Sequence, residues 1–147
     1  MNASLAEQFV LPALDAEWRR LDLLAWCLAK SRRGETLGDE ELDSLRRLQV
    51  EVQLLREPEG VWETALGFGL QPLEYDILAC TLGPEIEPRI GWAFQNLQAG
   101  TAQPWATRSL IQELLALDTG QGEQLRRALA PESTLRRRRL VRLEQDD

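Results

Sequence analysis

The sequence predicts a mainly α protein in which an N-terminal helical hairpin precedes a compact unit of short helices and a small C-terminal β element. Three observations predict this fold class. Residues 12–31 and 39–57 repeat apolar side chains at helical spacing over several turns. Beyond residue 58, glycines and prolines divide the chain into much shorter apolar segments. Residues 135–144 alternate, imperfectly, between apolar and basic side chains, as strands do.

The two long segments predict an antiparallel helical hairpin. Pro12 suits the first turn of the first helix, and Gly34 follows its end. Asp39 is a suitable N-cap for the second helix. The apolar stripes run through Leu14, Trp18, Leu21, Leu24 or Ala25, and Leu28, and through Leu42, Leu45, Leu48 or Gln49, Val52 and Leu55. These stripes are expected to bury against each other and the rest of the fold, or to leave a part exposed for a partner helix.

The short helices are delimited by helix-breaking residues. The first starts near Val61 and ends at Gly67 or Gly69, and the second runs from Pro72 to a stop at Gly83-Pro84. Three more segments complete the series: a helix from Pro88 to Gly100 with Ile90, Trp92 or Ala93, Phe94 and Leu97 facing inward, one starting at Thr107, and one that follows a flexible loop at 119–122 and ends at Pro131.

Residues 135–144 are predicted to form a strand or hairpin. Short helices followed by a β-hairpin are the composition of a winged-helix domain. Because Pro58-Glu59-Gly60 marks a boundary, we expect a helical hairpin at 1–58 and a winged-helix-like domain at 59–147.

Composition limits the classes of function. The 147 residues carry a net charge of −7 that is unevenly distributed. Residues 1–122 hold 10 basic and 19 acidic groups, whereas residues 123–147 hold 7 and 5. An acidic body disfavours non-specific binding to a phosphate backbone. No apolar run approaches the roughly 18 residues of a transmembrane helix, and the N-terminus lacks the pattern of a signal peptide. We therefore expect a cytoplasmic protein, with Cys27 and Cys80 as buried thiols rather than a disulfide.

No catalytic, cofactor or metal site is expected. The chain has no histidine, which removes the commonest general base and metal ligand. Lys30-Ser31 lacks the two preceding glycines of a phosphate-binding loop. Four carboxylates, Glu74, Asp76, Glu85 and Glu87, are interpreted as helix caps and surface groups, with a metal or catalytic pair as the alternative. The prediction is that the chain is not an enzyme.

Tryptophans and arginines are the candidate interaction residues. Trp18, Trp26 and Trp105 belong to the core or, where exposed, anchor an interface. The basic run Arg136, Arg137, Arg138 and Arg139, together with Arg142, is the most conspicuous charge feature. It contacts nucleic acid from a wing, or pairs with acidic groups of the body or of a following domain.

Residues 59–144 resemble a known family in several short segments that contain glycine, proline and acidic residues. The matching residues are Phe68-Gly69-Leu70, Pro72, Glu74, Asp76 and Leu78, then Leu82-Gly83-Pro84-Glu85-Ile86-Glu87-Pro88-Arg89, then Phe94–Leu97, then Leu129–Leu135 and Arg139–Leu143. This pattern is similar to the N-terminal winged-helix-type region of bacterial AAA+ ATPases, including those encoded with phage-tail-like contractile injection systems.

The resemblance implies a non-catalytic role. In that family an ATPase module follows this region, and its nucleotide-binding motifs are absent here. The chain is then an N-terminal fragment or a stand-alone relative. The implied function is a protein-interaction or adaptor domain that recruits a partner or substrate to the motor. A winged-helix nucleic-acid-binding domain using Arg136–Arg139 is the alternative.

Overall fold

The computed structural model describes residues 12–98 and 103–143, and all secondary structure in these two ranges is helical. The helices, in chain order, are η1 (Pro12–Leu14), α2 (Asp15–Arg32), α3 (Asp39–Leu55), α4 (Val61–Leu66), α5 (Pro72–Ile86), α6 (Pro88–Leu97), α7 (Arg108–Leu114), α8 (Thr119–Ala128) and α9 (Thr134–Arg137). None of them is long and apolar enough to cross a membrane.

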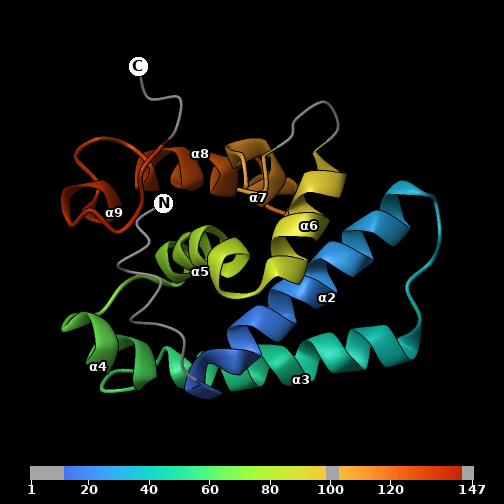
Figure 1. The fold of residues 1–147 in the computed structure, drawn as a ribbon, viewed down its shortest axis with the longest axis horizontal. Helices are drawn as coiled ribbons and strands as arrows, with labels where there is room; N and C mark the ends of the chain where they lie inside the picture. Colours follow the sequence, from blue (N-terminus) through green and yellow to red (C-terminus); the bar gives the residue numbers. More distant parts are fainter. Residues whose placement is uncertain (1–11, 99–102, 144–147) are drawn as a thin grey trace.

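Helix α2 and helix α3 form the predicted antiparallel hairpin, and α5 and α6 lie between it and the C-terminal helices (Figure 1). Helix α3 runs along one side of the molecule, whereas α7, α8 and α9 lie on the opposite side of α5. Helix α2 packs against α3, α5, α6 and α7, so the first half of the hairpin is part of the fold's centre.

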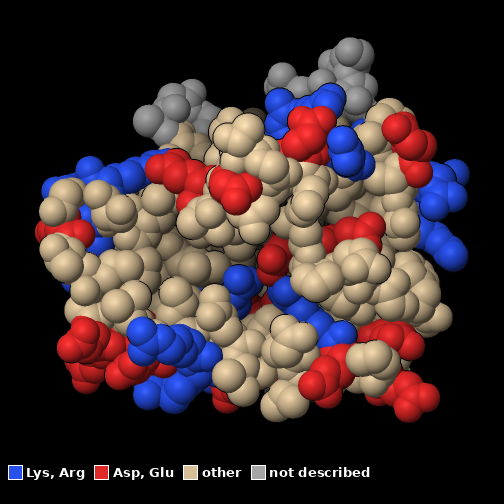
Figure 2. Space-filling model, turned by 180° about the vertical axis from the view of Figure 1, so that it is seen from behind, with Lys and Arg blue, Asp and Glu red and all other residues tan. Residues whose placement is uncertain are grey.

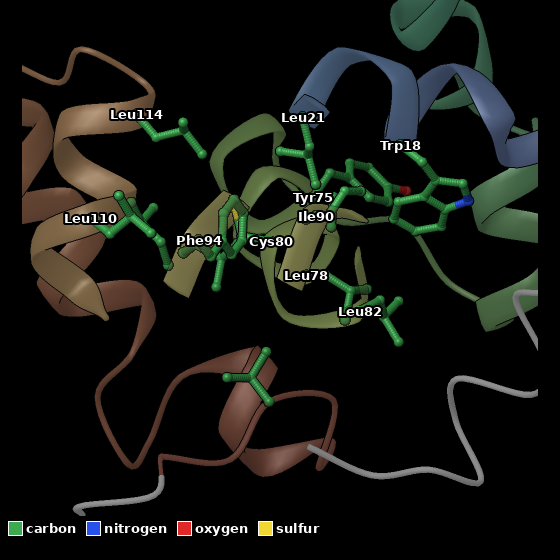
Figure 3. Close-up of a cluster of buried hydrophobic side chains, with 14 of the residues drawn as sticks. Trp18, Leu21, Tyr75, Leu78, Cys80, Leu82, Ile90, Phe94, Leu110 and Leu114 are labelled. Atoms are coloured by element: carbon green, nitrogen blue, oxygen red, sulfur yellow. The ribbon is translucent and has the colours of Figure 1, made fainter. Parts of the chain in front are cut away.

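Helix α5 is the core helix. Its residues from Ile77 to Cys80 have no exposed surface, so consecutive positions are buried all round the helix. Figure 3 shows side chains of α2, α5, α6 and α7 gathered in one cluster, with Leu21 and Ile90 close to α5. The N-terminal hairpin and the short helices therefore share a single hydrophobic core.

The predicted stop at Gly83-Pro84 is wrong, because α5 continues to Ile86 with Pro84 inside the helix. Proline lacks an N–H, but so near the helix end the loss costs a single backbone hydrogen bond. Gly83 is a contact point rather than a breaker. A Cβ built on it would lie 3.1 Å from Leu21 Cδ1 and 3.3 Å from Ile90 Cγ2. The missing side chain lets α2 and α6 approach α5 closely.

The predicted loop at 119–122 is also wrong, since these residues form the first turn of α8. Asp118 is the N-cap, and its Oδ1 accepts a hydrogen bond from Gln121 N, while Asp118 N donates to Gln121 Oε1. This capping box supplies partners for the first helix N–H groups and offsets the cost of the two glycines.

The predicted C-terminal β element is not present in the described residues 135–143. Ser133 caps α9 instead, with its Oγ accepting a hydrogen bond from Arg136 N. Arg139 then turns the chain at φ 57°, and Leu140 and Val141 both donate from their backbone N–H to Leu135 O. This turn buries Leu135, Leu140 and Val141 together in the core, which an alternating strand would separate onto two faces. Residue 144 lies outside the described residues.

Candidate protein-interaction site

The described residues contain no arrangement suited to nucleophilic or metal chemistry. No group of three or more His, Cys, Asp or Glu in this part of the chain is placed to hold a metal ion. Both cysteines are buried and unpaired. Burial raises the pKa of Cys80 to about 12, and burial together with Glu41 raises the pKa of Cys27. Their thiolates, the reactive forms, are thereby disfavoured.

The described residues form a groove between the start of α7, the end of α8 and the segment around α9. We call it the arginine groove; its cavity volume is about 690 Å³. It is lined by Ile77, Thr81, Trp105, Ala106, Thr107, Arg108, Ser109, Ile111, Arg126, Leu129, Ala130, Pro131, Arg136, Val141, Arg142 and Leu143. Four of these residues are arginines, and none is Asp or Glu.

Buried aliphatic side chains form the base of the arginine groove, and arginines surround its mouth. Ile77, Ile111 and Val141 belong to the hydrophobic core. Arg108 and Arg126 are exposed at the surface. Above these core residues, the lining includes the partly exposed Ala106, Ala130 and Leu143. A ligand in this groove would therefore meet both apolar side chains and guanidinium groups, in a chain whose overall charge is −7.

Gln98 fixes the backbone at the edge of the arginine groove that carries Trp105 and Arg108. The Gln98 side chain donates to Trp105 O at 2.9 Å and accepts from Thr107 N at 2.8 Å. Thr107 then caps α7, with its Oγ1 accepting from Leu110 N at 3.1 Å. Arg108 is thus the first helical residue, where a cation does not complement the helix dipole. Helix stability does not account for its presence there.

The other arginines are held by local contacts. Arg126 forms an ion pair with Glu123, one turn earlier on α8. This hydrogen bond lowers the pKa of Glu123, and the charges of Arg126, Arg127 and Arg108 act in the same direction. Arg136 Nη1 donates to Leu129 O at 2.9 Å, which ties α9 to the end of α8. Glu123 therefore pairs with one arginine of the groove, and Arg136 is tied to the backbone of α8.

The candidate interaction residues predicted from the sequence lie in different parts of the structure. Trp105 and Arg136 both line the arginine groove. Trp18 is buried and packs edge-on against Trp62, with ring centroids 6.5 Å apart. Trp26 is 55% exposed on the hairpin, and its Nε1 donates to Glu41 Oε2 at 3.1 Å. Trp18 is therefore a core residue, whereas Trp26 and Trp105 remain accessible.

The four consecutive arginines at 136–139 also have different surroundings. Arg136 lines the groove, whereas the guanidinium of Arg138 lies over the ring of Phe68, 4.6 Å from its centroid. Arg137 and Arg139 are exposed at and just beyond the end of α9. The four cations do not form one surface, because a helical turn directs successive side chains to different sides.

Sequence reasoning singled out Arg142 together with the arginine run, but it missed Arg108 and Arg126 as groove residues. Arg108 and Arg126 lie on different helices, and no local pattern connects them. Arg142, close to the conspicuous arginine run, was the one with a visible signal.

A buried ion network was also missed, and it links α2, α3, α4 and α5. Glu17 has no exposed surface and accepts two hydrogen bonds of 2.8 Å from Arg56. Trp62 Nε1 donates to the same carboxylate at 2.7 Å. Arg56 also pairs with Asp76 at 2.8 Å, and Arg20 pairs with Asp76 at 3.0 Å.

The network is built for structure rather than for chemistry. Burial disfavours the charge on Arg56, but the hydrogen bonds and charges of Glu17 and Asp76 outweigh it and raise the pKa of Arg56. Two carboxylates and two guanidiniums balance, so the interior carries no net charge from this network. Asp76 thus has a structural role, and Glu74 and Glu87 accept hydrogen bonds at the starts of α5 and α6, in agreement with their interpretation as caps.

Comparison with protein families gives a match to the model described as "winged helix domain, variant", over residues 63–147. The match covers more than half of the chain. This chain belongs to the winged helix domain variant family. Comparisons with curated proteins and with solved structures gave no significant match. The arginine groove lies entirely within the winged helix domain, whereas the helical hairpin precedes it.

Proposed function

We propose that this winged helix domain is a protein-interaction module, and that its arginine groove binds an acidic segment of a partner protein that also carries apolar side chains. Winged helix domains bind nucleic acids or proteins, so the choice between them depends on the chemistry of the surface. The single observation that carries the proposal is the lining of the groove, with four arginines, no carboxylate among the described residues and an aliphatic base.

An acidic peptide matches both properties of the groove. Guanidinium groups bind carboxylates through paired, charge-assisted hydrogen bonds. Leucine, isoleucine or aromatic side chains of the same segment would bury against the partly exposed Ala106, Ala130 and Leu143 of the lining. Trp105 at the edge adds an aromatic contact of the type that contributes strongly to interfaces.

A nucleic-acid backbone matches the surface less well. Phosphate binding depends on several accessible cations on one surface, and here Arg138 is engaged with Phe68. On the face seen in Figure 2, acidic and basic side chains are interspersed rather than gathered into a broad basic area. Helix α7 contributes only Arg108 and Gln112 as long polar side chains that suit base or phosphate contacts.

We further propose that the domain is the N-terminal adaptor of a cytoplasmic AAA+ ATPase and recruits the partner to the motor. The support for this part is the sequence pattern of residues 59–144, with its Phe68-Gly69-Leu70 and Leu82–Arg89 segments, which resembles that family. ATP hydrolysis would then belong to a separate module. Isothermal titration of the 147-residue chain with ATP should give no binding heat, and micromolar binding would contradict the non-catalytic assignment.

Selection of peptides on the whole chain tests the groove. We expect a display library of random 16-residue peptides to yield sequences rich in Asp and Glu together with Leu, Ile, Phe or Trp. In fluorescence anisotropy titrations, Arg108→Glu should weaken the recovered peptides roughly five- to tenfold, because it places a carboxylate where the ligand brings its own. Arg19→Glu, a charge reversal of an exposed arginine on α2, is the matched control and should leave affinity unchanged.

Three outcomes contradict the proposal. The library yields no enriched peptide, the recovered peptides are basic or uncharged, or Arg108→Glu binds them as well as the unchanged chain does. A fluorescein-labelled DNA duplex is titrated in parallel. Binding of the duplex that is tighter than that of the peptides and is lost on changing Arg136–Arg139 to Ala would favour the nucleic-acid function instead.

A further inference from the structure

Helix α3 presents apolar side chains on two opposite sides. Its inner side carries Leu48 and Val52, which are 6% and 3% exposed and face the fold. Its outer side carries Val50 and Leu54, which are 63% and 58% exposed. Val50 lies two residues from both buried positions, about 200° around a helix that turns 100° per residue. The hairpin's own packing therefore accounts for only one of the two apolar sides.

The outer side of α3 has the spacing of a helix-pairing seam. Asp43, Arg47, Val50 and Leu54 of α3, and Glu57 two residues beyond its end at Leu55, follow one another at intervals of four, three, four and three residues. This is the heptad pattern that keeps side chains on one side of a helix against a partner helix. All five residues are exposed. We call these five residues the outer stripe.

The charges of the outer stripe are arranged for a partner that runs in the opposite direction. The stripe is symmetric in sequence about position 52. Val50 and Leu54 lie two residues before and after it, and Arg47 and Glu57 lie five residues before and after it. A second copy of α3 crossing antiparallel at Val52 therefore places Arg47 against Glu57 at both ends. A parallel copy would place like charges together.

Neither Arg47 nor Glu57 forms an ion pair with another described residue. Arg47 donates to Ser44 Oγ at 3.1 Å and reaches no carboxylate of the described residues. Glu57 forms no ion pair with a described residue, whereas Asp43 is paired with Arg46 at 2.7 Å. Figure 1 shows α3 along one side of the molecule, remote from α7–α9, so a second copy can approach it without covering the arginine groove.

We propose that the outer stripe is a homotypic contact, in which two copies of this chain pair through antiparallel α3 helices. The pairing is two-fold symmetric, so each contact between Arg47 and Glu57, and between Val50 and Leu54, occurs twice. It goes beyond the proposed function, because the groove and the stripe lie on different parts of the surface. Two exposed aliphatic residues per copy make a small interface, which predicts a weak, concentration-dependent dimer.

Sedimentation velocity of the full chain tests the contact. Between roughly 10 µM and 1 mM chain, the weight-average mass should rise from that of one copy toward that of two. Arg47→Glu and Glu57→Arg should each raise the dimer Kd about tenfold or more, because symmetry creates two like-charge contacts. The double variant Arg47→Glu/Glu57→Arg should restore dimerisation. Val50→Glu should abolish it, and Arg127→Glu, an exposed charge on α8, should not alter it.

Far-ultraviolet circular dichroism checks that each variant keeps the fold. A chain that stays monomeric at 1 mM overturns the proposal. So does a dimer whose Kd is unchanged by the single charge reversals, or one that the double reversal does not restore. Peptide binding at the arginine groove is read separately by anisotropy, so failure of one proposal is distinguishable from failure of the other.

Discussion

At the scale of single residues, Glu17 shows how a charged side chain can be completely buried in this fold. Its carboxylate accepts two hydrogen bonds from Arg56 and one from Trp62, so all the charge is matched by donors. A buried ion pair contributes little net stability over apolar residues of similar size, but the loss of one partner leaves the other charged and unsolvated. The pair therefore specifies how α2, α3 and α4 meet.

The residue-scale prediction concerns this carboxylate. Glu17→Ala should lower the free energy of unfolding by about 3–5 kcal/mol, because Arg56 loses its main buried partner. Urea titration followed by circular dichroism measures the change. Glu51→Ala is the matched control, since Glu51 pairs with Arg19 at 3.9 Å and both are more than half exposed. Its effect should stay within about 0.5 kcal/mol. Equal costs for the two variants would contradict the structural role of the network.

The starts of α3 and α5 illustrate what local sequence predicts well at the scale of elements. Helix α3 begins at Asp39 and α5 at Pro72, close to the predicted starts, but the N-cap of α3 is Gly38 and not the predicted Asp39. Starts are marked by residues that satisfy free N–H groups, which is a local property. Ends were predicted less well. At Gly83-Pro84, close packing by α2 and α6 outweighed the local tendency to stop.

The element-scale prediction compares two glycines. Gly83→Ala should destabilise the fold by about 1–2 kcal/mol, since the new Cβ meets the buried Leu21 and Ile90 at 3.1 and 3.3 Å. Gly120→Ala, in the first turn of α8, meets only Asp118 Oδ1 at 3.5 Å and should be neutral or stabilising by up to about 1 kcal/mol. Thermal unfolding measures both. A stabilising Gly83→Ala would show that the three-helix contact is loose.

At the scale of the whole molecule, the hairpin and the winged helix domain share one core. Trp18, Leu21 and Ala25 of α2 belong to the same cluster as the side chains of α5, α6 and α7. The division into residues 1–58 and 59–147 stays a prediction, because a family match over 63–147 does not say whether that part folds alone.

The whole-molecule prediction tests that division. If the shared core governs stability, the full chain unfolds in one transition, with tryptophan fluorescence and circular dichroism giving coincident urea curves. Residues 59–147 alone should then be much less stable than the full chain, because Ile90 and Tyr75 lose their α2 contacts. Two separate transitions, or a fragment as stable as the whole, would show that the hairpin is an independent domain.

Local patterns in the sequence were enough to predict the helical class, the order of most helices and the starts of α3, α4 and α5. These features depend on residues a few positions apart, and their physical causes are local. Only the tertiary structure decided that residues 135–143 turn rather than form a strand, because Leu135, Leu140 and Val141 are buried by distant helices.

Tertiary structure also decided which charges matter. It joined Glu17, Arg56 and Asp76 in the interior, and it gathered Arg108, Arg126 and Arg136 around one groove, although they come from α7, α8 and α9. Such sites are invisible to a local pattern, since burial and the approach of residues far apart in the chain exist only once the helices pack together.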